Sequence, residues 1–137
     1  MKFQNREHES NLIRLLLKDK SNPKDMERLA MFYILAGNSD LYSKVNQIYD
    51  FDEHLIKLDC LTNRSVDLCS SARALVKLGF NLYNSYEDEN FTPMDILSNL
   101  DSENYSLAME SFNVRFGYSS KEEVNEEVNE EDDEIKM

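Results

Sequence analysis

The sequence VDLCSSARALVKLGFNLYN, residues 66–84, has the pattern of a long amphipathic helix. Its polar residues recur at spacings of three and four and therefore share one helical face: Ser70, Arg73, Lys77, Asn81 and Asn84. The opposite face is wide and apolar, with Leu68, Ala72, Leu75, Val76, Gly79, Leu82 and Tyr83. A small domain buries such a face against other elements, so we expect the remaining helices to pack around this one.

The length and composition predict one helical domain. The chain has 137 residues, 41% of them hydrophobic, which is enough for one folded core. It has only three glycines and two prolines, which argues against a turn-rich β fold and against a glycine-loop nucleotide fold. We therefore expect an all-α, compact single-domain bundle of about five helices over residues 1–118.

Helix ends are predicted from capping and breaking residues. A first helix over residues 5–20 ends before Pro23, which then opens a second helix with Asn22 or Ser21 as its cap. Gly37 ends that second helix as a left-handed residue. Further helices are expected over residues 39–50, over 93–100 after Thr92, and over 103–117 after Asp101 or Ser102, with Gly117 as the stop.

The buried faces are predicted from the spacing of apolar residues. In the first helix the stripe is Leu12, Ile13, Leu16 and Leu17, with Phe3 and Leu15 packing at its edges. The second helix is apolar nearly all round, so we expect it to be buried and to pack on the 68–84 helix. The last helix has a stripe of Tyr105, Ala108, Met109, Phe112 and Phe116. Residues 51–65 show no clear period, and we expect an irregular segment with a helical turn because no partner strand for HLIKL is visible.

Negative charge is concentrated at the C-terminal end. The chain carries 27 acidic and 15 basic residues, for a net charge of −12. Nine of those acids lie close together: Glu122, Glu123, Glu126, Glu127, Glu130, Glu131, Asp132, Asp133 and Glu134. Dense like charge without apolar residues predicts a disordered acidic tail over residues 119–137. This charge opposes binding to nucleic acid or anionic membrane and attracts a protein with a basic surface. The alternative interpretation is a tail that only keeps the protein soluble and has no partner.

Cellular location is predicted from the cysteines and from apolar runs. Cys60 and Cys69 are too few for a disulfide framework in a chain of this length. No apolar run approaches the roughly 20 residues that span a bilayer, and the start MKFQNREHES lacks the apolar core of a signal peptide. These features predict a reduced, cytoplasmic protein.

Candidate catalytic and metal sites centre on residues 50–69, and each has a simpler interpretation. Cys69 falls in the first turn of the central helix, where a thiol pKa is lowered, but a small buried residue is the favoured interpretation. Cys60, Cys69 and His54, with His8 or an aspartate, are a conceivable zinc set. They lack the closely spaced pair of a structural zinc site.

The acidic cluster Asp50, Asp52, Glu53 and His54 offers oxygen ligands for Mg²⁺ but lacks the calcium-loop pattern, so a solvated loop is favoured. Arg73 and Lys77 lie one turn apart on the 66–84 helix, and we expect them to form ion pairs with nearby carboxylates. Because phosphate loops, nucleophile elbows and paired metal-binding histidines are all missing from the sequence, we predict no catalytic residues, no metal and no cofactor.

The segments ERLAMFYILAGNSDLYSKVNQIYDF, VDLCSSARALVKLGFNLYN and TPMDILSNLD resemble a family of small uncharacterised acidic proteins of Gram-positive bacteria, their phages and mobile elements. The resemblance covers roughly residues 3–117 and leaves the acidic tail outside. It implies a compact cytosolic domain, and a mobile-element setting favours a role in the antagonism of host defence.

The leading hypothesis is a non-enzymatic acidic interaction protein, in its concrete form a phage or mobile-element anti-defence inhibitor of a basic nucleic-acid-handling host protein. One alternative is a small enzyme or metal-binding domain using residues 50–69. Another is a homodimeric structural or regulatory module, formed through the second helix or the Phe112/Phe116 face.

Overall fold

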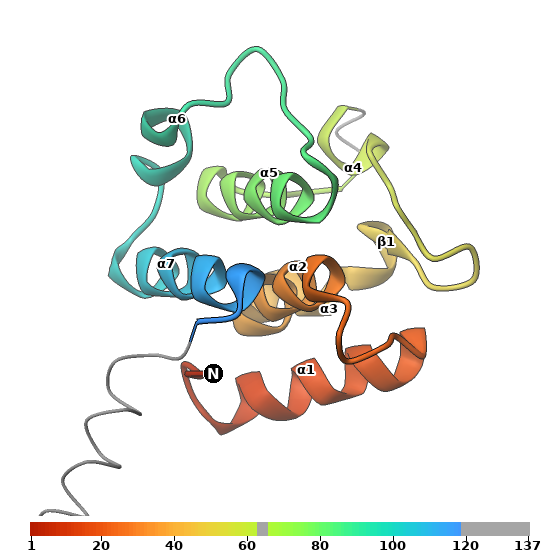
Figure 1. Ribbon diagram of the computed structural model, residues 1–137. Helices are drawn as coiled ribbons and strands as arrows, with labels where there is room; N and C mark the ends of the chain where they lie inside the picture. Colours follow the sequence, from red (N-terminus) through yellow and green to blue (C-terminus); the bar gives the residue numbers. More distant parts are fainter. Residues whose placement is uncertain (63–65, 119–137) are drawn as a thin grey trace, which may run out of the picture.

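The computed structural model describes residues 1–62 and 66–118, and this part of the chain is mostly helical (Figure 1). Its elements are, in order, α1 (Arg6–Asp19), α2 (Met26–Gly37), α3 (Ser39–Ser43), a 3₁₀ helix η1 (Val45–Gln47), β1 (Tyr49–Asp50), β2 (Leu55–Ile56), α4 (Asp59–Thr62), α5 (Ser70–Asn84), α6 (Pro93–Leu97) and α7 (Ser102–Phe116). The all-α prediction is therefore confirmed in outline, although these residues form seven α-helices and one small sheet. The predicted tail, residues 119–137, lies outside the described residues.

Helix α2 lies at the centre of the bundle, with α1, α5 and α7 packed around it (Figure 1). Every residue from Ala30 to Ala36 is buried, because α2 carries apolar side chains on all its faces. The predicted burial of this helix and its direct packing on α5 are confirmed. The central element is nevertheless α2 and not the 66–84 segment around which we expected the helices to pack.

Helix α5 begins later and is buried more widely than predicted. Cys69 is its N-cap, so the preceding Val66 and Leu68 contribute to the core from outside the helix. Ala74, Leu78 and Phe80 are buried in addition to the predicted apolar face. The extra burial follows from the contacts of α5 with α6 and α7 as well as with α2.

Pro23 does not open α2. It follows Asn22 in a turn in which the amide of Asp25 donates to the carbonyl of Asn22 at 2.9 Å. The helix starts at Met26, and the Asp25 carboxylate caps it by accepting from the amide of Arg28 at 3.0 Å. The predicted caps Asn22 and Ser21 are therefore wrong, because proline suits the second position of a turn as well as the first position of a helix.

Gly37 ends α2 as predicted, but its backbone is not left-handed. Its role is close packing. A Cβ atom at this position would lie 2.9 Å from the ring of His8 and would collide with Leu107 of α7. A glycine here therefore allows α1 and α7 to approach α2, and Asn38 then starts α3 directly.

The 39–62 region differs most from the prediction. The expected helix over residues 39–50 breaks after Ser43 into η1 and β1, although Leu41, Val45 and Ile48 are buried as expected. Leu55–Ile56 does have a partner strand, since β1 and β2 pair antiparallel with Tyr49 opposite Ile56. The predicted helical turn is present as α4.

The ends of the last two helices confirm the capping signals. Thr92 and Asp95 form a reciprocal capping box at the start of α6, which ends at Leu97 and not at residue 100. Asp101 caps α7 by accepting from the amide of Asn104 at 2.9 Å. Gly117 ends α7 with a φ angle of 78°, in the left-handed region that favours glycine.

The predicted inward faces of α1 and α7 are confirmed only in part, because Leu12, Leu16, Ala108 and Phe112 pack in or against the core but their stripe neighbours do not. In α1 the buried residues are His8, Asn11, Leu12, Leu15 and Asp19, while Ile13 and Leu17 face solvent. In α7 they are Leu107, Ala108, Ser111 and Val114. Both helices bury polar side chains that hydrogen-bond within the fold, and both leave large apolar side chains outside. Apolar spacing alone therefore identified only some of the residues that face the core.

Candidate protein-interaction site

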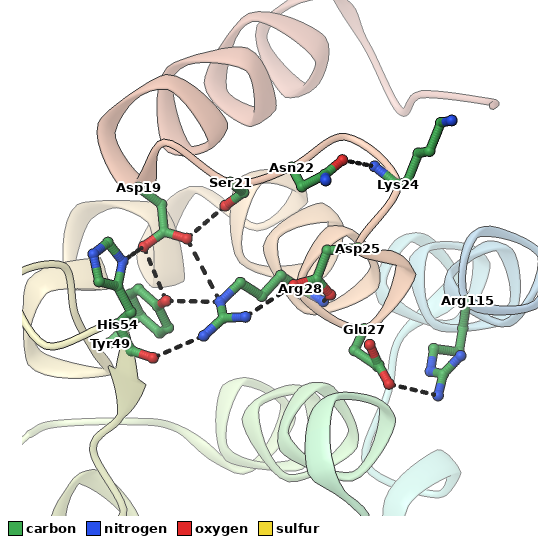
Figure 2. A network of polar contacts seen from close by, with 10 residues as sticks. All are labelled: Asp19, Ser21, Asn22, Lys24, Asp25, Glu27, Arg28, Tyr49, His54 and Arg115. Carbon is green, nitrogen blue, oxygen red and sulfur yellow. Dashed lines mark hydrogen bonds and ion pairs between the residues drawn. The ribbon is translucent and has the colours of Figure 1, made fainter.

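One polar network joins the C-terminal end of α1 to α2 and to the β hairpin (Figure 2). At its centre the Asp19 carboxylate, with 1% of its side chain exposed, accepts from the hydroxyl of Tyr49 at 2.9 Å and from the hydroxyl of Ser21 at 2.5 Å. Nδ1 of His54 lies 2.7 Å from the same carboxylate. A buried charge that is bonded on both oxygens is satisfied where it lies.

Arg28 closes the network from the first turn of α2. Its Nε atom donates to the Tyr49 hydroxyl at 3.1 Å and lies 3.6 Å from the Asp19 carboxylate. The two terminal nitrogens of its guanidinium bond the Asp25 carboxylate and the carbonyl of His54, each at 2.9 Å. Arg28 therefore ties the hairpin to α2 and uses all three of its nitrogens within the fold.

The pKa values in this network follow from burial and hydrogen bonding. Burial alone raises the pKa of Asp19, but the hydrogen bonds from Ser21, His54 and Tyr49 outweigh it and hold the pKa below its ordinary value. Burial raises the pKa of Tyr49 to about 12, so its hydroxyl remains protonated at neutral pH and donates to Asp19. At neutral pH the network therefore contains an ionised Asp19 and a protonated Tyr49.

The arrangement is that of a structural anchor. Its hydroxyl groups both point at Asp19 and are engaged there. His54 has a φ angle of 60°, a conformation uncommon outside glycine, and its contact with Asp19 holds the hairpin loop in place. The hollow next to Arg28 is shallow and open, and Asp25, Glu27, Leu55, Ile56, Tyr83 and Asn84 complete its lining.

The predicted metal candidates are not brought together. Cys60 is buried in the core, where burial raises its thiol pKa to about 11, whereas His54 belongs to the network around Asp19. Cys69 is exposed, which corrects the prediction of a small buried residue. Hydrogen bonds with the Ser71 hydroxyl and with the Ala72 amide lower the pKa of Cys69. In residues 1–62 and 66–118 no three histidine, cysteine or acidic residues are arranged to hold a metal ion.

The acidic cluster lies in the hairpin loop and makes local contacts. The Asp50 carboxylate accepts from the amides of Asp52 and Glu53, at 2.9 and 3.0 Å, and so shapes the turn. Asp52, Glu53 and His54 are exposed, as expected of a solvated loop.

The two basic residues of α5, Arg73 and Lys77, both bond to other parts of the fold. Lys77 pairs with Asp88 at 3.1 Å, and Arg73 donates to the carbonyl of Leu61 at 2.8 Å. Lys77 thus pairs with a carboxylate as predicted, whereas Arg73 bonds the backbone at the end of α4.

The outward face of α7 is apolar. Tyr105, Met109 and Phe116 leave 46%, 41% and 63% of their surface exposed, and Phe112 between them is half-buried. These four residues, which we call the α7 stripe, follow one another at spacings of four, three and four and therefore share a face. They are the side chains that were predicted to point inward.

The α7 stripe borders a hollow of about 480 Å³ between α7 and the start of the chain. Lys2, Ser106, Glu110 and Asn113 line it together with Tyr105, Met109 and Phe112. The first residues are held there because the Lys2 amide donates to Glu110 at 3.3 Å and Gln4 donates to the carbonyl of Glu103 at 2.7 Å. The hydroxyl of Tyr33 also donates to the carbonyl of Lys2. Aromatic and methionine side chains of this kind are enriched at the centres of protein interfaces.

The nine acidic residues predicted to bind a partner lie beyond residue 118 and so outside the described residues. Sequence reasoning missed Asp19, Arg28 and Tyr49, because no local pattern links positions so far apart. It named the residues of the α7 stripe as an apolar face of the last helix, and only the homodimer alternative placed Phe112 and Phe116 at the surface. The indication that the stripe is exposed was that α7 has large apolar residues on more than one face.

The described residues thus define a mostly helical domain with one small β hairpin and an apolar outer face on α7. The chain belongs to a family of unknown function (DUF6075), which matches residues 1–128. The match confirms the resemblance to an uncharacterised family and extends it to residue 128, so the prediction that the tail lies outside the family is wrong for residues 119–128. No curated protein and no solved structure matches the chain significantly. None of the described helices is long and apolar enough to cross a bilayer.

Proposed function

We propose that this chain is a non-enzymatic protein that binds a partner with a basic surface through its acidic residues 122–134. The observation that carries the proposal is the charge distribution. Nine of the 27 acidic residues lie in that short stretch, with Lys121 and Lys136 as the only basic residues beyond residue 118. A polyanion of this kind is attracted to the lysine- and arginine-rich surfaces that bind DNA or RNA.

The concrete form of the proposal is inhibition by competition. The acidic stretch occupies the basic surface of a nucleic-acid-handling protein of the host cell and displaces the nucleic acid. In this form of the proposal the chain is a phage or mobile-element anti-defence inhibitor. The described residues support the non-enzymatic part, because the polar network around Asp19 has its hydroxyl groups engaged with Asp19 and its guanidinium bonded to the hairpin.

The test compares the full chain with a variant whose nine acidic tail residues are replaced by the matching amides, so that the length is unchanged. Each protein is immobilised and exposed to lysate of a Gram-positive bacterium at low salt. The recovered basic protein is then purified and bound to labelled duplex DNA or RNA. We expect the full chain to displace the nucleic acid and the amide variant to do so at least about tenfold less well, with a weaker dependence on salt.

Two results contradict the proposal. One is an amide variant that binds and competes as well as the full chain at every salt concentration. The other is a full chain that recovers no basic protein. Recovery of many unrelated basic proteins also argues against it, because such capture reflects non-specific attraction to a polyanion.

A further inference from the structure

His8 is a buried histidine that takes no part in the polar network around Asp19. It lies in the first turn of α1 with 2% of its surface exposed. The centroid of its ring is 4.4 Å from that of Tyr33 in α2 and 5.1 Å from that of Phe3. A Cβ atom at Gly37 would lie 2.9 Å from the same ring. The imidazole is therefore enclosed by α2 and by the residues that precede α1.

The two partners of the His8 ring determine which nitrogen carries the proton. Nε2 lies 2.8 Å from the carbonyl of Tyr33, which only accepts, so Nε2 is the donor. Nδ1 lies 3.1 Å from the backbone amide of Gln4, which only donates, so Nδ1 is the acceptor. The neutral imidazole satisfies both contacts. An imidazolium donates from both nitrogens and therefore cannot accept from Gln4.

Gln4 belongs to a short segment beside α7, residues 1–4, which we call the N-terminal strap (Figure 1). The Lys2 amide donates to Glu110 at 3.3 Å, and the Lys2 carbonyl accepts from the hydroxyl of Tyr33. The Gln4 side chain donates to the carbonyl of Glu103 at 2.7 Å. The strap is thus attached by hydrogen bonds and by one aromatic side chain, and it can leave α7 while the helices remain packed.

Burial makes the charged form of His8 unfavourable while the strap is docked. It lowers the pKa of His8, although the bond to the Tyr33 carbonyl acts in the opposite direction. The charged and titratable groups at this end of the bundle lie on α1, on the strap, on α7 and on α2: Glu7, Lys2, Glu103, Glu110 and Tyr33. The carboxylates favour an imidazolium, whereas burial and the Gln4 amide oppose it. When the strap leaves, Nδ1 meets water and Nε2 keeps its bond to the Tyr33 carbonyl.

We propose that His8 is a proton-operated latch, whose protonation releases residues 1–4 from α7 while the helical bundle stays folded. The strap is fully docked above pH 6.5 and is lost as the pH falls through the lowered pKa of His8. Its release takes Lys2 away from the hollow beside α7 and uncovers the hydroxyl of Tyr33. Mild acid thus reshapes this face of the protein. The latch is separate from the acidic residues on which the proposed function rests.

The test is a titration of the full chain by nuclear magnetic resonance, from about pH 7.5 to about pH 4.5, a range that brackets histidine protonation. Amide spectra follow Lys2 and Gln4, and the imidazole nitrogen shifts report the tautomer and the protonation of His8. Circular dichroism of the same samples follows the helices. The protonation of His54, which bonds Asp19 at the opposite end of α1, is followed as an internal control.

Three variants accompany the full chain. His8→Gln removes the group that gains the proton. Tyr33→Phe keeps the buried ring and removes one hydrogen bond of the strap, so protonation meets less opposition and the strap leaves at higher pH. Tyr49→Phe makes the same change in the network around Asp19 and controls for a general loss of stability.

We expect the Lys2 and Gln4 signals to move to unstructured positions together with the protonation of His8, below pH 6.5, while circular dichroism is unchanged. Tyr33→Phe raises the midpoint by at least about 0.5 pH unit, Tyr49→Phe leaves it unchanged, and His8→Gln abolishes the transition. If His8→Gln does not fold, the coincidence of the two transitions in the unmodified chain and the shift in Tyr33→Phe decide.

Four results overturn the latch. The first is a strap whose signals persist until the whole domain unfolds. The second is a strap that is already unstructured at neutral pH. The third is a release that occurs at the same pH in His8→Gln, and the fourth is an unchanged midpoint in Tyr33→Phe.

Discussion

Replacing Asp19 by alanine removes the acceptor at the centre of the polar network. Three donors lose their partner, but they are not equivalent. Ser21 and His54 reach solvent and become hydrated again, whereas Tyr49 has no exposed surface and its hydroxyl keeps only the contact with Arg28. A hydrogen bond to a charged group contributes about 1.5–3 kcal/mol, and a stranded buried donor costs about 1–3 kcal/mol. The expected loss of unfolding free energy is therefore about 3 kcal/mol, which lowers the thermal midpoint by about 12 °C for a domain of this size.

The assay is urea unfolding followed by circular dichroism, with Asp40→Ala as the control. Asp40 pairs with Lys44 at 3.0 Å on the surface, and its side chain is 47% exposed, so its removal changes the unfolding free energy by less than about 1 kcal/mol. Because the pKa of Asp19 is lowered in the fold, its contribution is complete at neutral pH. It is lost as the pH falls from the ordinary aspartate value, about 3.9, through the lowered one. The difference between Asp19→Ala and the unmodified protein should therefore shrink in strong acid.

The reasoning is refuted if Asp19→Ala is destabilised by no more than Asp40→Ala at pH 7. A further check is the double variant with Tyr49→Phe. If Asp19 and Tyr49 act through their shared hydrogen bond, the two losses are not additive and differ from their sum by at least about 0.5 kcal/mol.

Three further predictions concern other parts of the fold. Burial lowers the pKa of His8, although its contact with the Tyr33 carbonyl acts in the opposite direction. The contribution of neutral His8 to stability is therefore complete above pH 6.5 and is lost as the pH drops through the lowered value. His8→Gln removes this dependence, and the prediction is contradicted if the unfolding free energy in urea changes equally between pH 7 and 5 in the variant and in the unmodified protein. Gly37→Ala destabilises by about 1–3 kcal/mol because the added methyl group collides with neighbouring helices. The methyl group added by Gly79→Ala comes no closer than 3.6 Å to a neighbouring atom, so this change stabilises α5 by about 0.5–1 kcal/mol. The thermal midpoint should therefore fall for Gly37→Ala and rise for Gly79→Ala, and shifts of the same sign refute the packing argument. In the native state a thiol reagent modifies Cys69 at once and Cys60 only on unfolding, and two equally fast thiols argue against the burial of Cys60.

Much of the helical framework was predictable because its ends depend on local chemistry. The Thr92–Pro93 start, the Asp101 cap and the Gly117 stop each involve residues within one turn of one another, and all three signals were interpreted correctly. The prediction that Pro23 opens α2 failed because proline suits both a turn and a helix start. The packing of α1 on α2, which local sequence does not reveal, selects the turn. The short hairpin failed for a similar reason, since two paired residues on each strand leave no periodic pattern.

The orientation of α1 and α7 was not predictable from hydrophobic spacing. His8 and Asp19 are polar yet buried, because each finds partners on another helix or on the hairpin that the sequence does not reveal. The same limitation hid the network itself, in which Asp19, Arg28 and Tyr49 come from three separate elements. The charged tail, in contrast, was evident from composition, and its proposed function remains a prediction.

The burial of α2 on every side has a consequence for the synthesis of the protein. This helix, the most apolar in the chain, leaves the ribosome early, while α5 and α7 are made about 45 and 75 residues later. At synthesis rates of about 5–20 residues per second, α2 waits several seconds for the helices that cover it. During that time its apolar surface has only α1 as an available long partner. Ribosome-bound chains in which α2 has emerged and α5 has not should therefore bind chaperones strongly, and chains from which α7 has also emerged should release them.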